Sequence, residues 1–392
     1  MADTPKSLDD VKPKFSPILG LPIADAPVRT DSPTAPKPDD TGRPELSVII
    51  PARDEELNLE ACLASLLAQD DDFFKLGEDW ELIVVDDAST DRTRAIANSL
   101  QREGMTVLEA PPLELRATQR AFTGKTQACW TGAQQARGRW LLFTDADTIH
   151  EPGDLVRALH EAKKHKVALL SYSPRQILSG IVQHALMPLV FSELASVYPP
   201  KEVNDPGKHL AAANGQFLLV DRAAYFTAGG HRAVGRSVLE DVDLAWNIKR
   251  AGARNGNRYI RLRYAPDALS TRMYRTLGEM MEGWEKNLAL LFPHALMLAA
   301  WRMLDIALLL LPLLILILPY MVWWKDAILW LVWIRNLVRF YGRVRRSNFS
   351  WLDCLLSAFA LPLFIYLLVR SWMNYKLFHQ VTWKGREYRT GR

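Results

Sequence analysis

Cysteine is scarce in this chain. Only three cysteines, Cys62, Cys129 and Cys354, occur among 392 residues, and no two of them have the spacing of a metal-binding pair. Such scattered cysteines exclude a disulfide scaffold and a zinc motif, and they are typical of a reducing compartment. The N-terminus also lacks a basic start followed by an apolar core, so we predict no secretory signal peptide.

Two glycine-rich phosphate-binding motifs are absent as well. No Gly-x-Gly-x-x-Gly follows a predicted strand, and no Gly-x-x-x-x-Gly-Lys-Ser/Thr occurs anywhere. These absences disfavour a dinucleotide-binding site and a P-loop.

Large apolar residues are few in the first segment of the chain. Residues 1–43 are rich in Pro, Asp, Lys and Thr. Such a segment buries too little surface to offset its ordering entropy, so we predict a mostly disordered leader, with an extended packed strap as the alternative. The hydrophobic residues, 49% of the chain, must therefore be concentrated elsewhere.

Strand and helix patterns alternate after this leader. Short apolar runs at 46–50, 80–86, 105–109 and 140–144 predict buried strands, and helical periodicity lies between them. The alternation at βαβ spacing predicts an α/β domain with a mostly parallel sheet and helices on both faces. We place this domain at residues 44–292.

Polar clusters follow three of these strands. Pro51-Ala52-Arg53-Asp54-Glu55 comes after the first strand, Asp86-Asp87 after the second and Asp145-Ala146-Asp147 after the fourth. In open α/β sheets ligands bind outside the carboxyl ends of the strands, so three clusters at one edge predict a ligand site. Gly124-Lys125 precedes a helix, where a lysine and backbone amides can meet an anion.

Six motifs occur in order along residues 44–290: PARDEELN, VDDASTD, GKTQA, DAD, NGQFLLVDRAAY and LEDVDLAWNIKRAG. In these motifs the chain resembles the family-2 glycosyltransferases, which are inverting nucleotide-sugar enzymes of GT-A fold. The stretch RMYRTLGEMMEGWEKN, two apolar C-terminal segments and VTWKGREY are similar to the lipid-acceptor branch, which includes hopanoid-associated, carotenoid and ceramide-type enzymes.

The resemblance implies a nucleotide pocket at the first two polar clusters. Pro51, Arg53 and Glu55 would line it. Asp86 would accept a hydrogen bond from the uracil ring, with Asp87 close by. The alternative is a purely structural role, in which Asp86 or Asp87 only caps the following helix.

The resemblance also implies a cation at the donor. Lys125 would hold the base or the diphosphate, although a solvated lysine at a helix start is the alternative. Asp145 and Asp147 would bind Mg²⁺ or Mn²⁺, hard ions that prefer carboxylate and phosphate oxygens, and Asp145 would also contact the nucleotide sugar. Such a metal neutralises charge on the departing nucleoside diphosphate.

The predicted catalytic base lies in the last of the six motifs. Asp241 matches the base of the family, which takes the proton from an acceptor hydroxyl. Asp243 is its main rival. Glu240 would contact the diphosphate or the acceptor, or it would only supply a favourable charge at a helix N-terminus.

One departure from the family concerns polymer synthesis. Processive synthases carry Gln-x-x-Arg-Trp after the base, whereas this chain has EGWEKN at 282–287, which argues for a single transfer per acceptor. Arg272, Arg275 or Lys286 would replace the missing arginine at the diphosphate. Trp284 would contact the acceptor or pack in a core.

The C-terminal region, residues 293–392, is predicted to meet a membrane. Apolar helices at about 304–324 and 351–370 are long enough to span a bilayer, and 326–340 would span it or lie at its surface. The connector and the tail are both basic, and the positive-inside rule favours the cytoplasmic side for each. The number of spans, two or three, stays open.

These features together predict a membrane-anchored inverting glycosyltransferase. It would move a sugar from a nucleotide sugar, with UDP as the expected carrier, to a lipid hydroxyl. The expected location is the inner (cytoplasmic) membrane, multi-pass, with the catalytic domain facing the cytoplasm and no nucleic-acid partner. A polyprenyl-phosphate sugar synthase and a catalytically degenerate nucleotide-binding membrane scaffold are the alternatives.

Overall fold

The computed structural model describes residues 42–113, 122–255, 259–312, 323–383 and 386–389. They divide into two compact units. The α/β unit contains the described residues up to Leu178 and Tyr198–Tyr274, and the helical unit contains Ser179–Val197 and the described residues from Arg275 onward.

This division differs from the layout expected from the sequence. The helical unit starts before residue 293 and takes α5 (Gly180–Val197) from the middle of the chain. All but two residues of the expected leader, 1–43, lie outside the described residues.

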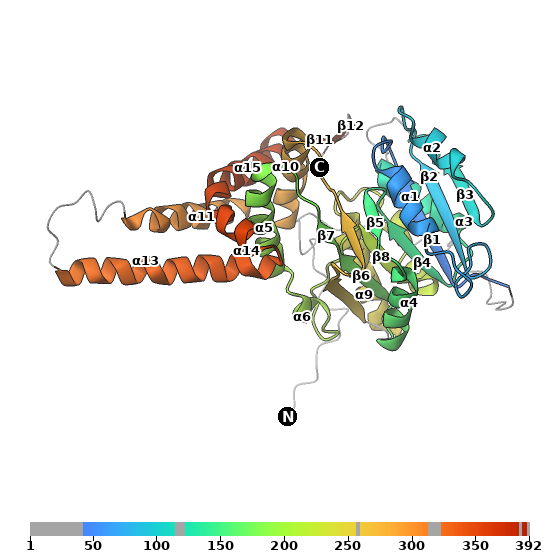
Figure 1. The fold of residues 1–392 in the computed structure, drawn as a ribbon, viewed down its shortest axis with the longest axis horizontal. Coiled ribbons are helices and arrows are strands. Elements are labelled where there is room, and N and C mark those ends of the chain that lie inside the picture. Colours follow the sequence, from blue (N-terminus) through green and yellow to red (C-terminus); the bar gives the residue numbers. More distant parts are fainter. Residues whose placement is uncertain (1–41, 114–121, 256–258, 313–322, 384–385, 390–392) are drawn as a thin grey trace, which may run out of the picture. The chain divides into compact units, whose positions relative to one another are not determined.

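A seven-stranded sheet forms the core of the α/β unit (Figure 1). Its strand order is β3-β2-β1-β4-β8-β6-β9. The first four are parallel to one another, β8 runs antiparallel between β4 and β6, and β6 and β9 are parallel. The predicted α/β, mostly parallel sheet is thus confirmed. The strands are β1 (Leu46–Ala52), β2 (Trp80–Asp86), β3 (Met105–Glu109), β4 (Trp140–Thr144), β6 (Leu169–Ser173), β8 (Phe217–Asp221) and β9 (Ile260–Tyr264).

Helices cover both faces of this sheet. Val48 and Ile50 of β1 share a buried apolar cluster with Leu63 of α1 (Leu59–Leu67). Ile49, whose side chain points to the other face, meets α3 (Gly124–Gln135), where a Cβ on Gly132 would lie 2.5 Å from the Ile49 side chain. Glycine at this position therefore permits the close approach of helix and sheet. The other helices of the unit are α2 (Thr93–Ser99), α4 (Asp154–Lys164), α6 (Pro200–Val203), α7 (Arg222–Thr227), α8 (Gly230–Ala233) and α9 (Glu240–Asn255).

A small second sheet continues from the aspartates that follow β4. β10 (Leu269–Thr271) pairs antiparallel with β5 (Thr148–His150) and parallel with β7 (Arg175–Gln176). It anchors the chain immediately after Asp147.

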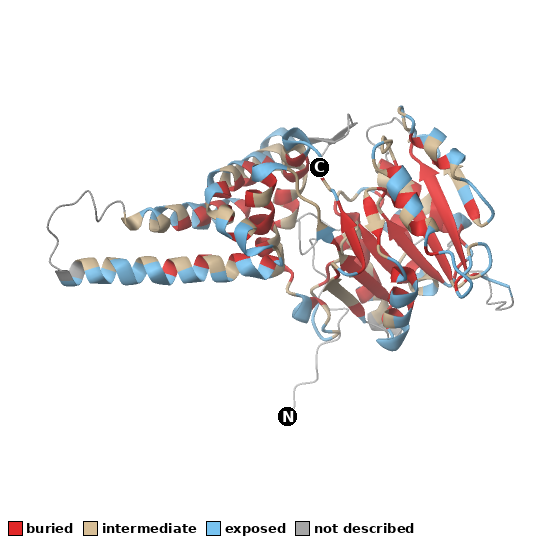
Figure 2. Cartoon of the chain, viewed as in Figure 1, coloured by how far each residue is buried: buried red, intermediate tan, exposed pale blue. Residues whose placement is uncertain are grey.

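The helical unit packs around α15 (Leu361–Met373), which lies against α10 (Leu277–Leu291) and α11 (Ala295–Leu309). Helices α11 and α13 (Trp323–Val344) run side by side, and much of α13 is exposed in Figure 2. The unit also contains α14 (Trp351–Leu356) and the strands β11 (Gln380–Trp383) and β12 (Arg386–Arg389).

Five charged side chains join three of these helices. Asp305 of α11, with a fully buried side chain, pairs with Arg302, Arg339 and Arg343 at 2.8–2.9 Å. Glu193 of α5 pairs with Arg302 at 3.1 Å and with Arg343 at 3.4 Å. We call these residues the Asp305 cluster.

Two helical segments within the described ranges are long and apolar enough to cross a membrane, Gly180–Val203 and Trp351–Phe378. The pair α10 and α11, bent by 110°, makes a third if it counts as one span. Trp351–Phe378 agrees with the segment expected at 351–370. Gly180–Val203 was not expected as a span, and much of the segment expected at 304–324 lies outside the described residues.

Candidate functional site

The carboxyl ends of β1 and β2 bring the predicted nucleotide residues together. Ala52 lies opposite Asp86 in the parallel register, and the Asp87 N–H donates to the Ala52 carbonyl at 2.8 Å. Arg53 donates from Nη1 to the Asp87 carbonyl at 2.8 Å. Pro51 precedes this contact at the end of β1.

The loop after β1 is fastened to the start of α2. The Glu55 N–H donates to Thr93 Oγ1 at 2.7 Å, and Asp54 Oδ1 accepts from the Thr90 N–H at 2.8 Å. Asp86 Oδ1 accepts from the Ser89 N–H at 3.3 Å, whereas the N-cap residue of α2 makes no side-chain cap. Asp86 therefore orders its own turn rather than capping that helix.

Asp145 and Asp147 occupy the first and third positions of one turn after β4. The Thr148 N–H and hydroxyl both donate to the Asp145 carbonyl, at 3.2 and 2.6 Å. Ala146, between the aspartates, is buried, whereas both aspartates are half-buried. We call residues 145–148 the aspartate turn.

Lys125 lies between two carboxylates at the start of α3. Its Nζ is 2.8 Å from Asp145 Oδ1 and 2.9 Å from Glu240 Oε1. A capping box between Thr123 and Thr126 fixes this helix start. Burial lowers the pKa of Lys125, but Asp145 and Glu240 raise it well above its usual value. Lys125 is thus a charged bridge between two carboxylates, with its side chain partly open to solvent.

Asp241 is held beside this bridge. Its Oδ2 accepts from the Gly215 N–H at 2.8 Å, and its Oδ1 accepts from the Val242 N–H at 2.8 Å. A Cβ on Gly215 would lie 3.1 Å from Lys125 Nζ and 3.4 Å from Asp241 Oδ2. Burial and the Glu240 carboxylate raise the pKa of Asp241 to about 7. Asp241 can therefore exchange a proton near neutral pH, as a general base must.

Asp243 has a different partner. Ser237 Oγ donates to Asp243 Oδ2 at 2.7 Å and accepts from the Leu239 N–H at 3.1 Å. Asp243 thus orders the start of α9, while Asp241 faces the Lys125 bridge. This contrast favours Asp241 of the two candidate bases.

The pKa of the buried Cys62 thiol is affected by carboxylates at and near the aspartate turn. Burial raises its pKa, and the negative charges of Asp147, Glu55 and Asp145 raise it further. The Asp147 carboxylate likewise adds to the effect of burial in raising the pKa of Tyr274. These directions are those expected if Glu55 and the aspartate turn share one edge of the sheet.

The remaining predicted contacts are spread over both units. Thr271 pairs with Thr148, the last residue of the aspartate turn. Arg272 is the next residue after this pair, and it is exposed. The others belong to the helical unit, and their link to the site stays a prediction: Arg275, Trp284 and Lys286. Trp284 itself is buried.

The aspartate turn offers two carboxylates, the ligand type that a hard divalent cation prefers, although Asp145 Oδ1 is paired with Lys125 in this structure. Within the ranges the structure describes, no group of three or more His, Cys, Asp or Glu side chains could hold a metal. Magnesium sites commonly use one or two carboxylates and take their other ligands from substrate phosphates and water. Asp145 and Asp147 supply that number.

Sequence reasoning missed two residues that organise the site, Gly215 and Ser237. Gly215 stands in the NGQFLLVD motif two residues before β8, where a glycine marks a close approach. Ser237 stands before the acidic start of α9, an arrangement that could have revealed a cap.

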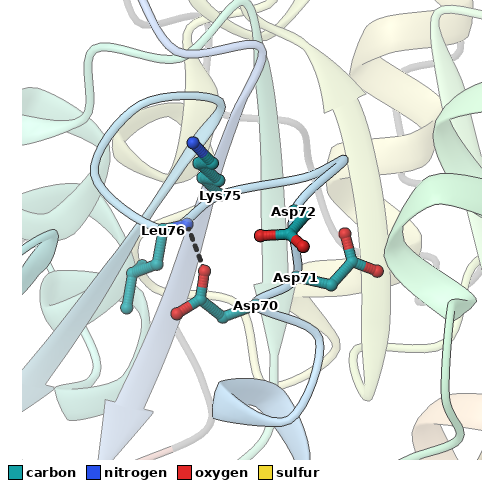
Figure 3. Close-up of a pocket in the computed structure, with 5 residues that line it drawn as sticks. All are labelled: Asp70, Asp71, Asp72, Lys75 and Leu76. Carbon is teal, nitrogen blue, oxygen red and sulfur yellow. Dashed lines mark hydrogen bonds between the residues drawn. The ribbon is translucent and has the colours of Figure 1, made fainter.

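An acidic cavity of about 510 Å³ lies away from this site, in the loop before β2 (Figure 3). Asp70 Oδ1 accepts from the Leu76 N–H at 2.9 Å, and Asp71 Oδ1 accepts from the N–H groups of Phe73 and Phe74. These acids order their own loop at the amino end of β2, opposite the carboxyl edge.

Comparisons with known proteins agree with this geometry. Residues 47–226 match the model of the family described as Glycosyl transferase family 2. Over 357 residues the chain is 26% identical to the 4,4'-diaponeurosporenoate glycosyltransferase of Staphylococcus aureus (strain USA300), with 88% of each chain covered.

Two solved structures are similar at lower identity. Mannosyltransferase PcManGT from Pyrobaculum calidifontis, in complex with GDP-Man and Mn²⁺, has 19% identity and a TM-score of 0.49 over 85% of this chain and 87% of that one. Glucosyl-3-phosphoglycerate synthase from Mycobacterium tuberculosis, in complex with Mn²⁺, UDP and glucosyl-3-phosphoglycerate, has 22% identity and a TM-score of 0.41 over 64% and 80%. With TM-scores below 0.5, neither likeness identifies a ligand of this chain.

Proposed function

Because this chain is a family-2 glycosyltransferase, matched over residues 47–226, we propose that it is a membrane-anchored, inverting enzyme. It moves a sugar from a nucleotide sugar, UDP-linked by expectation, to a lipid hydroxyl. The observation that carries the proposal is the Lys125 bridge between Asp145 and Glu240, with Asp241 held beside it through Gly215.

The proposed reaction is one displacement at the anomeric carbon. Asp241 takes the proton of the acceptor hydroxyl while its oxygen attacks that carbon and the bond to the diphosphate breaks. No covalent enzyme intermediate forms, so the configuration inverts. Lys125 offers its positive charge to the leaving diphosphate, and Arg53, Asp86 and Asp87 lie where the nucleoside would bind.

Asp145 and Asp147 would hold the divalent cation, Mg²⁺ or Mn²⁺. When bound, the cation supplies Lewis-acid stabilisation of the departing diphosphate. The hydrogen bonds from Thr148 to the Asp145 carbonyl hold the backbone of the turn that carries the two carboxylates.

The lipid acceptor is proposed from the helical unit and from the relative. Within the described residues, two or three apolar segments could cross a membrane. The Staphylococcus aureus relative is named for 4,4'-diaponeurosporenoate, a carboxylate, so it supports a lipid-like acceptor without supporting the choice of a hydroxyl. A multi-pass location in the cytoplasmic membrane, with the α/β unit on the cytoplasmic side, completes the proposal.

Mass spectrometry of lipids from cells with and without the chain tests this function. We expect a lipid heavier by one sugar residue only in cells that contain the chain. The mass difference reports the sugar, and the parent lipid reports the acceptor. Identical lipid profiles, with the protein expressed and folded, would contradict the proposal.

The pH dependence of transfer provides a second prediction. Because the base must be deprotonated and the pKa of Asp241 is raised to about 7, kcat/KM should fall as pH drops below 7 and level off above about 8. Glu240→Gln removes a neighbouring negative charge. It should therefore move the acidic limb down by about one pH unit. An unmoved limb would show that Asp241 is not the group that titrates.

A further inference from the structure

A buried polar network lies beneath the aspartate turn. His150 and Asp154 have fully buried side chains, and His150 Nδ1 is 2.7 Å from Asp154 Oδ2. His150 Nε2 is 3.1 Å from Thr144 Oγ1 and 3.4 Å from Thr148 Oγ1. Asp154 opens α4, where the helix dipole favours a carboxylate.

Thr144 directly precedes the aspartate turn, and Thr148 is its last residue. Thr144 is the last residue of β4, and its Oγ1 donates to the Gln216 carbonyl at 2.9 Å. Thr148 is the first residue of β5, and its Oγ1 donates to the Asp145 carbonyl at 2.6 Å. The network therefore includes a hydrogen bond to the backbone carbonyl of Asp145, a predicted metal ligand. It does more than supply hydrogen-bond partners to buried side chains.

The imidazole links Asp154 to a connected pair of hydroxyls. Thr144 Oγ1 and Thr148 Oγ1 lie 2.8 Å apart, so they contact each other as well as the two backbone carbonyls. His150 Nε2 is within hydrogen-bond distance of both hydroxyls, and its tautomer decides whether it donates or accepts. Nδ1 meets the Asp154 carboxyl, which orients the ring.

We propose that His150, oriented by Asp154, is a positioning residue that holds the aspartate turn in the geometry that binds the divalent cation. It acts through Thr144 and Thr148 and does not touch the cation or the sugar. Outer groups of this kind usually change metal affinity by about 10–100-fold when they are removed. The inference rests on the proposed function, because it assumes that Asp145 and Asp147 bind the cation.

The test measures Mn²⁺ binding by electron paramagnetic resonance on the full chain in detergent, with UDP present as the probe ligand. His150→Asn keeps an amide near the Nδ1 position but is too short to reach the threonines, whereas His150→Gln places an amide near the Nε2 position. We expect His150→Asn to weaken Mn²⁺ binding by about 10–100-fold and His150→Gln to retain most of it.

A second pair of variants tests the link to the turn itself. Thr148→Val removes the hydroxyl at similar volume and should also weaken Mn²⁺ binding, while Thr148→Ser should keep it. Glu81→Gln is the control for lost stability, because Glu81 is a buried carboxylate bonded to Ser47 and Arg137 at the opposite end of the sheet. It should lower the melting temperature without changing Mn²⁺ affinity.

Two outcomes would overturn the inference in different ways. If His150→Asn and Thr148→Val bind Mn²⁺ like the wild type below their melting temperatures, the network is only structural and the proposed function stands. If the wild type binds Mn²⁺ no better than Asp147→Ala, the metal site of the proposed function fails, and the inference fails with it.

Discussion

Asp241→Asn should lower the rate of sugar transfer to a lipid hydroxyl by about 10²–10⁴-fold, the usual contribution of a general base. The amide keeps the size of the side chain but cannot accept the acceptor's proton at pH 7. Lys125, Asp145 and Glu240 do not depend on this side chain for their mutual contacts. Binding of the nucleotide sugar should therefore change much less than the rate.

Single-turnover transfer, with donor binding measured separately, checks this expectation. Asp243→Asn is the matched control, because it changes an acid on the same helix that bonds Ser237 instead of facing the Lys125 bridge. We expect its rate to stay within about tenfold of the wild type. A larger loss in Asp243→Asn than in Asp241→Asn would exchange the roles of the two acids.

The same pair of variants separates the classes of acceptor. A lipid phosphate or carboxylate is already anionic and needs no base, so Asp241→Asn would keep much of its activity. That result would favour an anionic acceptor, either the lipid phosphate of a polyprenyl-phosphate sugar synthase or a lipid carboxylate. A catalytically degenerate scaffold would show no transfer in the wild type and no effect of either variant.

Local patterns in the sequence were sufficient to predict the carboxyl edge of the sheet. Buried strands read as continuous apolar runs, and parallel strands must deliver the residues after them to one edge. The ends of β1, β2 and β4 could therefore be predicted, and with them Arg53, Asp86 and Asp145. The fold confirms this strand layout.

The Lys125 bridge and the path of α5 could not be predicted in this way. Lys125 meets Glu240 across a long sequence separation, and no local pattern encodes that pairing. Gly180–Val197 is apolar nearly throughout, so its composition does not say which helices it packs against. The Asp305 cluster explains part of this packing, because Glu193 of α5 pairs with Arg302 on α11 and Arg343 on α13.

Asp305→Asn should destabilise the helical unit by about 3–5 kcal/mol, the cost of breaking a buried ion pair by removing one partner. The Asp305 side chain is fully buried and pairs with three arginines. Without its charge, Arg302 and Arg343 would keep Glu193 as a carboxylate partner, whereas Arg339 would keep no carboxylate of the cluster. Denaturant unfolding in detergent, followed by the tryptophan signal, measures the change. Arg335→Gln, an exposed change on α13, is the control and should cost less than about 0.5 kcal/mol.

Coupling to a second variant distinguishes lost pairing from a general loss of packing. Arg339→Met removes one of the cations that Asp305 neutralises. In the Asp305→Asn background it should therefore cost less than in the wild type, or even restore stability, with a coupling energy of about 0.5–3 kcal/mol. Additive effects of the two changes would mean that the ion pairs contribute little. The three helices would then be held together by their apolar contacts alone.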